Sequence, residues 1–183
     1  MHRQHRTRSL SRRRQRRQHT MMIPVTLNNK KTVLDADPSE SLLTVLRREK
    51  LFKVKCGCEK GFCGNCMVLL DDNPIPSCKI AASMVRDSRI VTLEYFVNYP
   101  VYKDIVSGFN EAGIHLCGYC DAGKILTAYD LLRKYRRVEP QQIFEAVKHL
   151  DCCCTDRDTL VNGILYAVAA KHAREGRLEN GKK

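Results

Sequence analysis

Four cysteines in the first half of the chain have the spacing of a metal site. Cys58, Cys63 and Cys66 follow the pattern C-x₄-C-x₂-C, and Cys78 comes after eleven further residues. This is the thiolate spacing of a plant-type [2Fe–2S] site, in which a loop wraps one edge of the cluster and a distant cysteine completes it. The alternative is a four-cysteine zinc site, but zinc sites usually bring their cysteines in two close pairs. We therefore predict a [2Fe–2S] cluster here.

A second group of cysteines lies in the other half of the chain. Cys117 and Cys120 form a C-x₂-C pair, and after thirty-one intervening residues Cys152 and Cys154 form a C-x-C pair. A C-x₂-C pair alone is also used by zinc sites and redox dithiols. The two pairs meet if both loops lie at one end of a helical region, where helix N-termini favour thiolates and an anionic cluster. With the first site an iron–sulfur site, a second [2Fe–2S] site is predicted here.

Other candidate ligands lie beside these two groups. Cys153 lies between the predicted ligands Cys152 and Cys154, and one residue separates Cys56 from Cys58. We interpret both as small residues beside a ligand. His115 and His149 are close to the second group in sequence. Eight cysteines already complete two clusters, so both histidines are interpreted as loop or helix-end residues.

The loop of the first group needs strands and a helix to hold it. Ile23, Val25 and Leu27 alternate with polar or turn-forming residues, as in a strand, and 31–35 supplies its hairpin partner after an Asn-Asn turn. A helix starting at 37–40 has an apolar face over 42–46. The other expected elements are a strand at 67–70, a turn at 71–74 and a last strand at 90–95. This pattern predicts a small mixed sheet, of the β-grasp kind found in plant-type ferredoxins.

The second half of the chain switches to a helical period. Apolar residues recur three and four apart in four segments: 101–112, ending at Gly113; 125–132; 140–150, opened by Glu139; and 160–168, fading before Gly176. Four short helices with short connections predict a compact bundle. The fold class is therefore α+β, with a ferredoxin-like domain at 22–97, a four-helix domain at 98–176 and a tail at 177–183.

The positive charge of the chain is concentrated at its start. The net charge is +12, but residues 1–20 contain eight arginines and no carboxylate, which leaves +4 for the rest. Such a segment has too little apolar surface to fold, so residues 1–21 are expected to be a disordered basic extension. The alternative is that this charge run forms an arm that binds nucleic acid.

The sequence also indicates the cellular compartment in which the protein functions. The sequence contains no run of about 18 apolar residues, the length needed to span a membrane, and no secretory signal is found. Ten cysteines without a secretory signal favour a reducing cytoplasm, where clustered cysteines bind metals.

Together, the three cysteine segments resemble the iron–sulfur subunit of the xanthine dehydrogenase/aldehyde oxidase (molybdenum hydroxylase) family. The resemblance covers roughly residues 22–173. It implies a ferredoxin-like domain and a four-helix domain with one [2Fe–2S] cluster each. By that similarity Cys58, Cys63, Cys66 and Cys78 bind the cluster nearer a flavin. The cluster nearer a molybdopterin is bound by Cys117, Cys120, Cys152 and Cys154.

The resemblance further implies an electron-transfer subunit of an oxidoreductase, with no substrate site and no catalytic residue of its own. Its expected partners are a large molybdopterin-binding subunit and an FAD-binding subunit. The chain departs from the family pattern around the second cluster. Leu116 replaces a glutamine that touches the pterin, 121–123 reads Asp-Ala-Gly instead of Thr-Pro-Gly, and 152–156 reads Cys-Cys-Cys-Thr-Asp instead of Cys-Arg-Cys-Thr-Gly.

Two other functions stay open at this point. One is a free-standing two-cluster carrier, or a redox subunit of a different dehydrogenase such as an amine or opine oxidase. The other is a zinc-stapled module whose arginine-rich start binds nucleic acid, which predicts a colourless protein with salt-sensitive binding. No phosphate-binding loop, dinucleotide fingerprint or Ser/His/Asp pattern supports a catalytic site on this chain.

Overall fold

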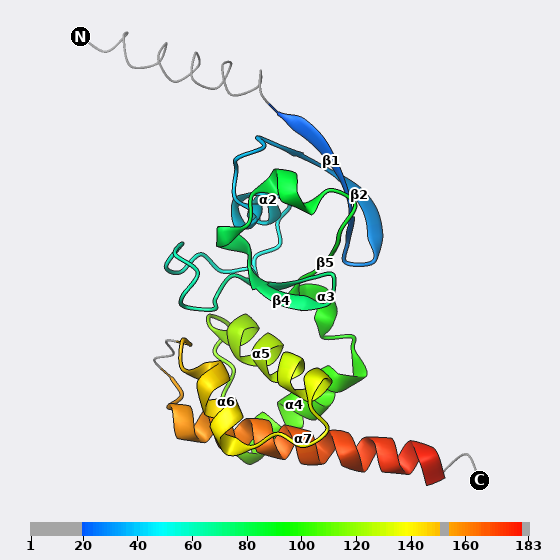
Figure 1. Cartoon of the computed structure of the whole chain (residues 1–183), viewed down its shortest axis with the longest axis vertical. Coiled ribbons are helices and arrows are strands. Elements are labelled where there is room, and N and C mark those ends of the chain that lie inside the picture. Colours follow the sequence, from blue (N-terminus) through cyan, green and yellow to red (C-terminus); the bar gives the residue numbers. More distant parts are fainter. Residues whose placement is uncertain (1–19, 151–153, 181–183) are drawn as a thin grey trace.

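A five-stranded sheet with one helix against it is followed by a group of longer helices (Figure 1). The computed structural model describes residues 20–150 and 154–180. The predicted basic extension therefore lies, up to residue 19, outside the described residues, as do Cys152, Cys153 and residues 181–183. The architecture confirms the predicted α+β class. Among the helices described, none has both the length and the apolar character needed to cross a membrane.

The sheet begins with the predicted hairpin of β1 (Met21–Leu27) and β2 (Lys30–Ala36). Asn28 and Asn29 have φ values of 50° and 64°, as a two-residue type I′ turn requires. The other strands are β3 (Met67–Leu70), β4 (Asn73–Pro76) and β5 (Arg89–Val91). Their order is β2-β1-β5-β3-β4, and β1 and β5 are the parallel pair. A parallel central pair between antiparallel neighbours is the mixed sheet that was predicted.

The helix on the sheet, α2 (Leu42–Arg48), begins later than the sequence indicated. Its N-cap is Ser41, whose hydroxyl accepts a hydrogen bond from the backbone N–H of Thr44 at 3.3 Å. The predicted start at 37–40 is wrong because Asp37 accepts the backbone N–H of Ser39 at 2.9 Å, which makes a turn there instead.

Two boundaries on the strand side also differ from the prediction. Asp71 and Asp72 alone make the turn, with φ values of 47° and 65°, and the following residues form β4. β4 contains two prolines, which a strand tolerates when it lies at the edge of a sheet, as β4 does. The predicted last strand ends at Val91, because Thr92 donates its N–H to the side chain of Asn28 at 2.9 Å and a short helix, α3 (Leu93–Phe96), follows.

Four helices form the second half: α4 (Pro100–Glu111), α5 (Asp121–Lys134), α6 (Pro140–Val147) and α7 (Arg157–Asn180). Gly113 ends the first helical segment with a φ of 74°, and Glu139 forms a capping box with Gln142. The prediction that the last helix fades before Gly176 is wrong. The helix continues to Asn180 because most residues there favour helix and only the glycine disfavours it.

The described residues form two hydrophobic cores, and one strand contributes side chains to both of them. The first lies between α2 and one face of the sheet, and it includes Val68. The second fills the helices and extends to Met67 and Leu69 on the other face of β3. Side chains of a strand alternate between faces, so β3 belongs to both cores. The helices, with α5 against β3 and β4, therefore cover the second face of the sheet.

Candidate metal centres

The first thiol group, defined as Cys58, Cys63, Cys66 and Cys78, forms where a loop after α2 meets the short 3₁₀ helix η1 (Ser77–Lys79). Backbone N–H groups within the loop point at sulfur atoms: that of Cys63 lies 3.4 Å from the Cys58 sulfur, and that of Cys58 lies 3.4 Å from the Cys63 sulfur. η1 brings Cys78 beside Cys66, since the backbone N–H of Ser77 donates to the Cys66 carbonyl at 3.1 Å. The sulfurs of Cys58 and Cys63 thus lie beside each other, and the Cys78 sulfur lies beside that of Cys66.

The thiols of the first group have very different acidities. The pKa of Cys58 is lowered to about 6 because the backbone N–H groups of Cys63 and Lys60 donate to its sulfur. The pKa of Cys78 is raised to about 12 because the thiol is desolvated by burial and lies beside Cys66. A positive ion would favour the thiolate form at every one of these positions.

The loop can wrap this closely only because it contains glycine. A Cβ at Gly57 would lie 2.7 Å from the Cys63 sulfur, which leaves no room for a side chain. Gly64 has a φ of 72°, in the left-handed region that glycine reaches at little cost.

The second thiol group, defined as Cys117, Cys120 and Cys154 among the described residues, lies at one end of the helices. The Cys154 sulfur is 3.8 Å from that of Cys117 and 4.0 Å from that of Cys120, and the three sulfurs lie within 4.8 Å of one another. α5 begins directly after Cys120, and α7 begins three residues after Cys154. The predicted fourth ligand, Cys152, lies outside the described residues.

Backbone donors favour thiolates in this group too. The pKa of Cys117 is lowered because the backbone N–H groups of Tyr119 and Cys120 donate to its sulfur. These donors come from the turn that leads into α5, so the same residues start the helix and solvate the sulfur. The Cys117/Cys120 pair and Cys154, which come from distant loops, therefore meet at one helical end.

The two groups are joined by a close contact between glycines. A Cβ at Gly123, in the first turn of α5, would lie 3.0 Å from the carbonyl oxygen of Gly64. A Cβ at Gly64 would in turn lie 2.5 Å from Leu150 and 3.3 Å from the Gly123 Cα. The ligand loop of the first group thus rests directly on the helix that begins at the second group.

Three of the remaining candidates from the sequence lie among the described residues. Cys56 is exposed and donates its thiol proton to the Glu59 carboxylate at 2.8 Å, which raises the pKa of Cys56. His115 and His149 are both outside the set of side chains near enough to share an ion with the second group. Desolvation lowers the pKa of His149, which favours its neutral form.

A donor set made of thiols alone fits an iron–sulfur cluster. [2Fe–2S] clusters are held by four cysteine thiolates, and backbone N–H groups near the sulfurs stabilise their negative charge. The first group offers four thiols, and the described part of the second offers three. When bound, such a cluster accepts and releases one electron.

Sequence reasoning missed a lysine in the second group. The side chain of Lys124 is only 1 % exposed, and its ammonium lies 3.6 Å from the Cys154 sulfur. Its position contained a signal, since residues 124, 128 and 131 fall on one buried face of α5. A charged residue in that apolar series was an indication of a buried partner.

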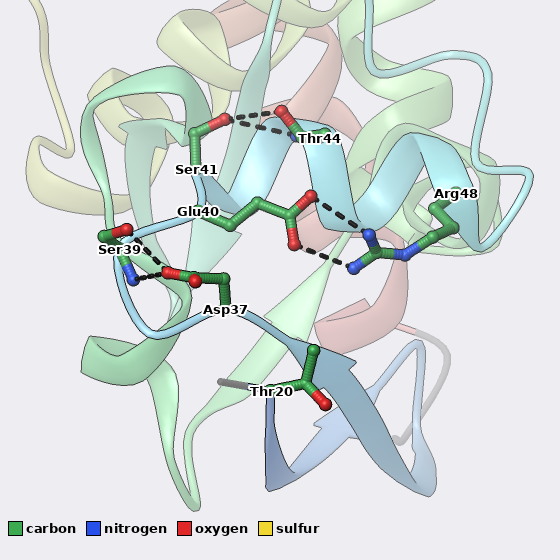
Figure 2. Close-up of a pocket in the computed structure, with 7 residues that line it drawn as sticks. All are labelled: Thr20, Asp37, Ser39, Glu40, Ser41, Thr44 and Arg48. Atoms are coloured by element: carbon green, nitrogen blue, oxygen red, sulfur yellow. Dashed lines mark hydrogen bonds and ion pairs between the residues drawn. The ribbon is translucent and has the colours of Figure 1, made fainter. Parts of the chain in front are cut away.

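A surface pocket beside α2 offers no further chemistry (Figure 2). Arg48 binds the Glu40 carboxylate through two hydrogen bonds of 3.0 and 2.9 Å. Ser41 and Asp37 make the cap and turn described above. These polar groups stabilise the start of α2. The residues that line the pocket are far in sequence from every cysteine of the second group.

Comparisons with known families agree with this geometry. A family model described as a 2Fe-2S iron-sulfur cluster binding domain matches residues 5–112, more than half of the chain. A second, described as a [2Fe-2S] binding domain, matches residues 92–165. The two matches divide the chain much as the two thiol groups do.

Individual proteins are similar over most of the chain. The nicotinate dehydrogenase small FeS subunit of Eubacterium barkeri is 34% identical over 80% of this chain and 94% of its own length. The xanthine dehydrogenase iron-sulfur-binding subunit of Escherichia coli O157:H7 is 33% identical over 80% and 93%. The structure of quinoline 2-oxidoreductase from Pseudomonas putida 86 superposes with a TM-score of 0.75 at 30% identity, covering 86% of this chain and 98% of that one.

Proposed function

The chain belongs to the family of [2Fe–2S] subunits of xanthine dehydrogenase- and aldehyde oxidase-type molybdenum hydroxylases, and from this membership we propose how its two thiol groups work. The chain is an electron-transfer subunit of an oxidoreductase. In our proposal Cys58, Cys63, Cys66 and Cys78 hold one [2Fe–2S] cluster. The other is held by Cys117, Cys120, Cys152 and Cys154.

One observation supports a relay between the two sites more than any other, namely the contact of Gly64 with Gly123. Gly64 lies inside the ligand loop of the first group, and Gly123 lies three residues after a cysteine of the second. Side chains are absent at both positions, so backbone touches backbone. Electrons pass from one site to the other across this contact.

Each half of the chain has a separate task in this proposal. Residues 22–97 form the domain that holds the first cluster, and 98–176 form the domain that holds the second. Backbone N–H groups stabilise the negative sulfurs at both sites, and the packed sheet and helices keep the sites in fixed positions.

The partners follow from the family. The related proteins are small subunits of complexes with large catalytic subunits. We propose that the second group faces a large subunit carrying molybdopterin and that the first group faces a subunit carrying FAD. The chain departs from the family pattern at Leu116 and Asp121, so its contact with the pterin subunit is expected to use different side chains.

A reducing compartment, the cytoplasm, suits this chemistry. The thiols of the first group form no disulfide, as cluster assembly requires.

Electron paramagnetic resonance on anaerobically purified, dithionite-reduced full chain tests the proposal. Two distinct signals and about four iron atoms per chain are expected from two [2Fe–2S] clusters. A single signal with about half that iron would contradict the second site. A colourless protein that contains zinc would contradict both and favour the zinc-stapled module.

A further inference from the structure

Lys124 is buried at the second thiol group. It lies in α5, one helical turn after Cys120, and its side chain is 1 % exposed. Lysine is almost never buried to this degree unless its charge is compensated. A compensating anion must therefore lie within reach of its ammonium group.

The contacts of Lys124 point to the sulfur atoms. The ammonium nitrogen lies 3.6 Å from the Cys154 sulfur and 3.3 Å from the Thr155 hydroxyl oxygen. Long side chains of a helix lean toward its N-terminus, and the N-terminus of α5 is where the second thiol group lies. The helix geometry and the measured contacts agree.

We infer that Lys124 is a positioning residue that raises the reduction potential of the cluster held by the second thiol group, an inference that rests on the proposed function of that group. Hydrogen bonds to the sulfurs, burial and net charge set iron–sulfur potentials. Reduction adds one electron to a cluster that four thiolates already make anionic. A buried ammonium group stabilises the more negative state, because charges interact more strongly where water is excluded. The second cluster thereby holds electrons more strongly than its thiolates and backbone alone would allow.

A redox titration of the full chain, followed by electron paramagnetic resonance, tests this role. Lys124→Met removes the charge and the donor, Lys124→Gln removes only the charge, and Lys124→Arg keeps both. Met and Gln are expected to lower the equilibrium constant for reduction of the second cluster by about tenfold or more, which is about 59 mV for one electron. Arg is expected to stay near the wild-type value, and the potential of the first cluster is expected to be unchanged throughout.

Lys134→Met is the matched control, because it removes the same charge from the same helix. Lys134 is half-exposed at the far end of α5, where it pairs with Asp130. Its loss should leave both potentials unchanged.

Each result decides the inference. Unchanged potentials in the Met and Gln variants would overturn it, as would an equal drop in the Lys134→Met variant. If both neutral variants lose the second signal and Lys124→Arg keeps it, the charge is needed to hold the cluster, which supports the inference. Loss in the Arg variant as well would overturn it. A wild-type chain without a second signal would instead contradict the proposed function, and this inference with it.

Discussion

At the scale of single residues, the thiols of the first group differ in what surrounds their sulfurs. Cys58 accepts two backbone N–H groups and has a pKa lowered to about 6, whereas Cys78 is desolvated and has a pKa raised to about 12. Such a spread follows when a loop provides donors to one sulfur and another sulfur packs against the hydrophobic core. A cluster would equalise them, because bound iron deprotonates every ligand.

Replacing one ligand tests the separation of the two sites. Cys63→Ser is expected to remove or alter the first cluster and to lower the iron content from about four to about two atoms per chain. The second signal should persist, because its cysteines come from other loops. Cys56→Ser is the control, since this exposed thiol donates to the Glu59 carboxylate and is not a predicted ligand. Loss of both signals in the Cys63→Ser variant would contradict two separate sites.

The cysteines could be found from the sequence because ligand spacing is local. Lys124 could not be placed, because its environment depends on residues 154 and 155, which the fold brings to it from about thirty positions away. Position 124 lies before the helical segment predicted at 125–132, and only the folded structure shows that it is buried in α5 and what it contacts.

At the scale of elements, α4 and α7 approach each other closely at a glycine. A Cβ at Gly108 would lie 2.2 Å from the backbone nitrogen of Ala167 and 2.6 Å from the Gly163 carbonyl oxygen. Both neighbours are backbone atoms, which cannot turn aside as a side chain can. Asp104, one turn earlier and buried, binds Arg174 of α7 at 2.9 Å. Glycine therefore sets the distance between these two helices, and an ion pair fixes their register.

Gly108→Ala is expected to destabilise the chain even though alanine favours helix. Overpacking of this kind costs about 1–3 kcal/mol of the free energy of unfolding. Gly176→Ala is the matched control, since nothing lies within 4 Å of a Cβ there, and it should stabilise by about 0.5–1 kcal/mol. Chemical denaturation of both variants gives the two values. A stabilising Gly108→Ala would show that the helices can separate without cost.

Element types were predictable, but several ends were not. Strong periodicity located the hairpin, α2 and the four helices. The strand expected at 90–95 ended early because Asn28, sixty-four residues before Thr92, binds its backbone N–H. Residues 73 and 74, predicted as part of a turn, begin β4, whose two prolines a strand tolerates only at a sheet edge. Both misses depend on distant parts of the chain.

At the scale of the whole molecule, the basic start of the chain differs in composition from the residues that follow it. β1 begins at Met21, and residues 1–20 contain no carboxylate. Deleting residues 1–20 is therefore expected to leave iron content, both signals and assembly with partner subunits unchanged. Iron analysis and size-exclusion chromatography measure this. A large loss of iron would show that the segment has a role in the fold, and salt-sensitive nucleic-acid binding that disappears with it would support the alternative of a binding arm.

The two halves act as one relay only if the first ligand loop stays on α5. Gly123→Val places a branched side chain where even a Cβ would lie 3.0 Å from the Gly64 carbonyl and 3.1 Å from Leu150. The loop must then move away from α5, while each thiol group keeps its own cysteines. Both signals are expected to persist, but the magnetic interaction between the two reduced clusters should weaken, because that interaction falls with distance. Gly176→Val controls for the lower helix propensity of valine, since its site on α7 is open. An unchanged interaction in the Gly123→Val variant would show that this glycine contact does not set the separation of the two sites.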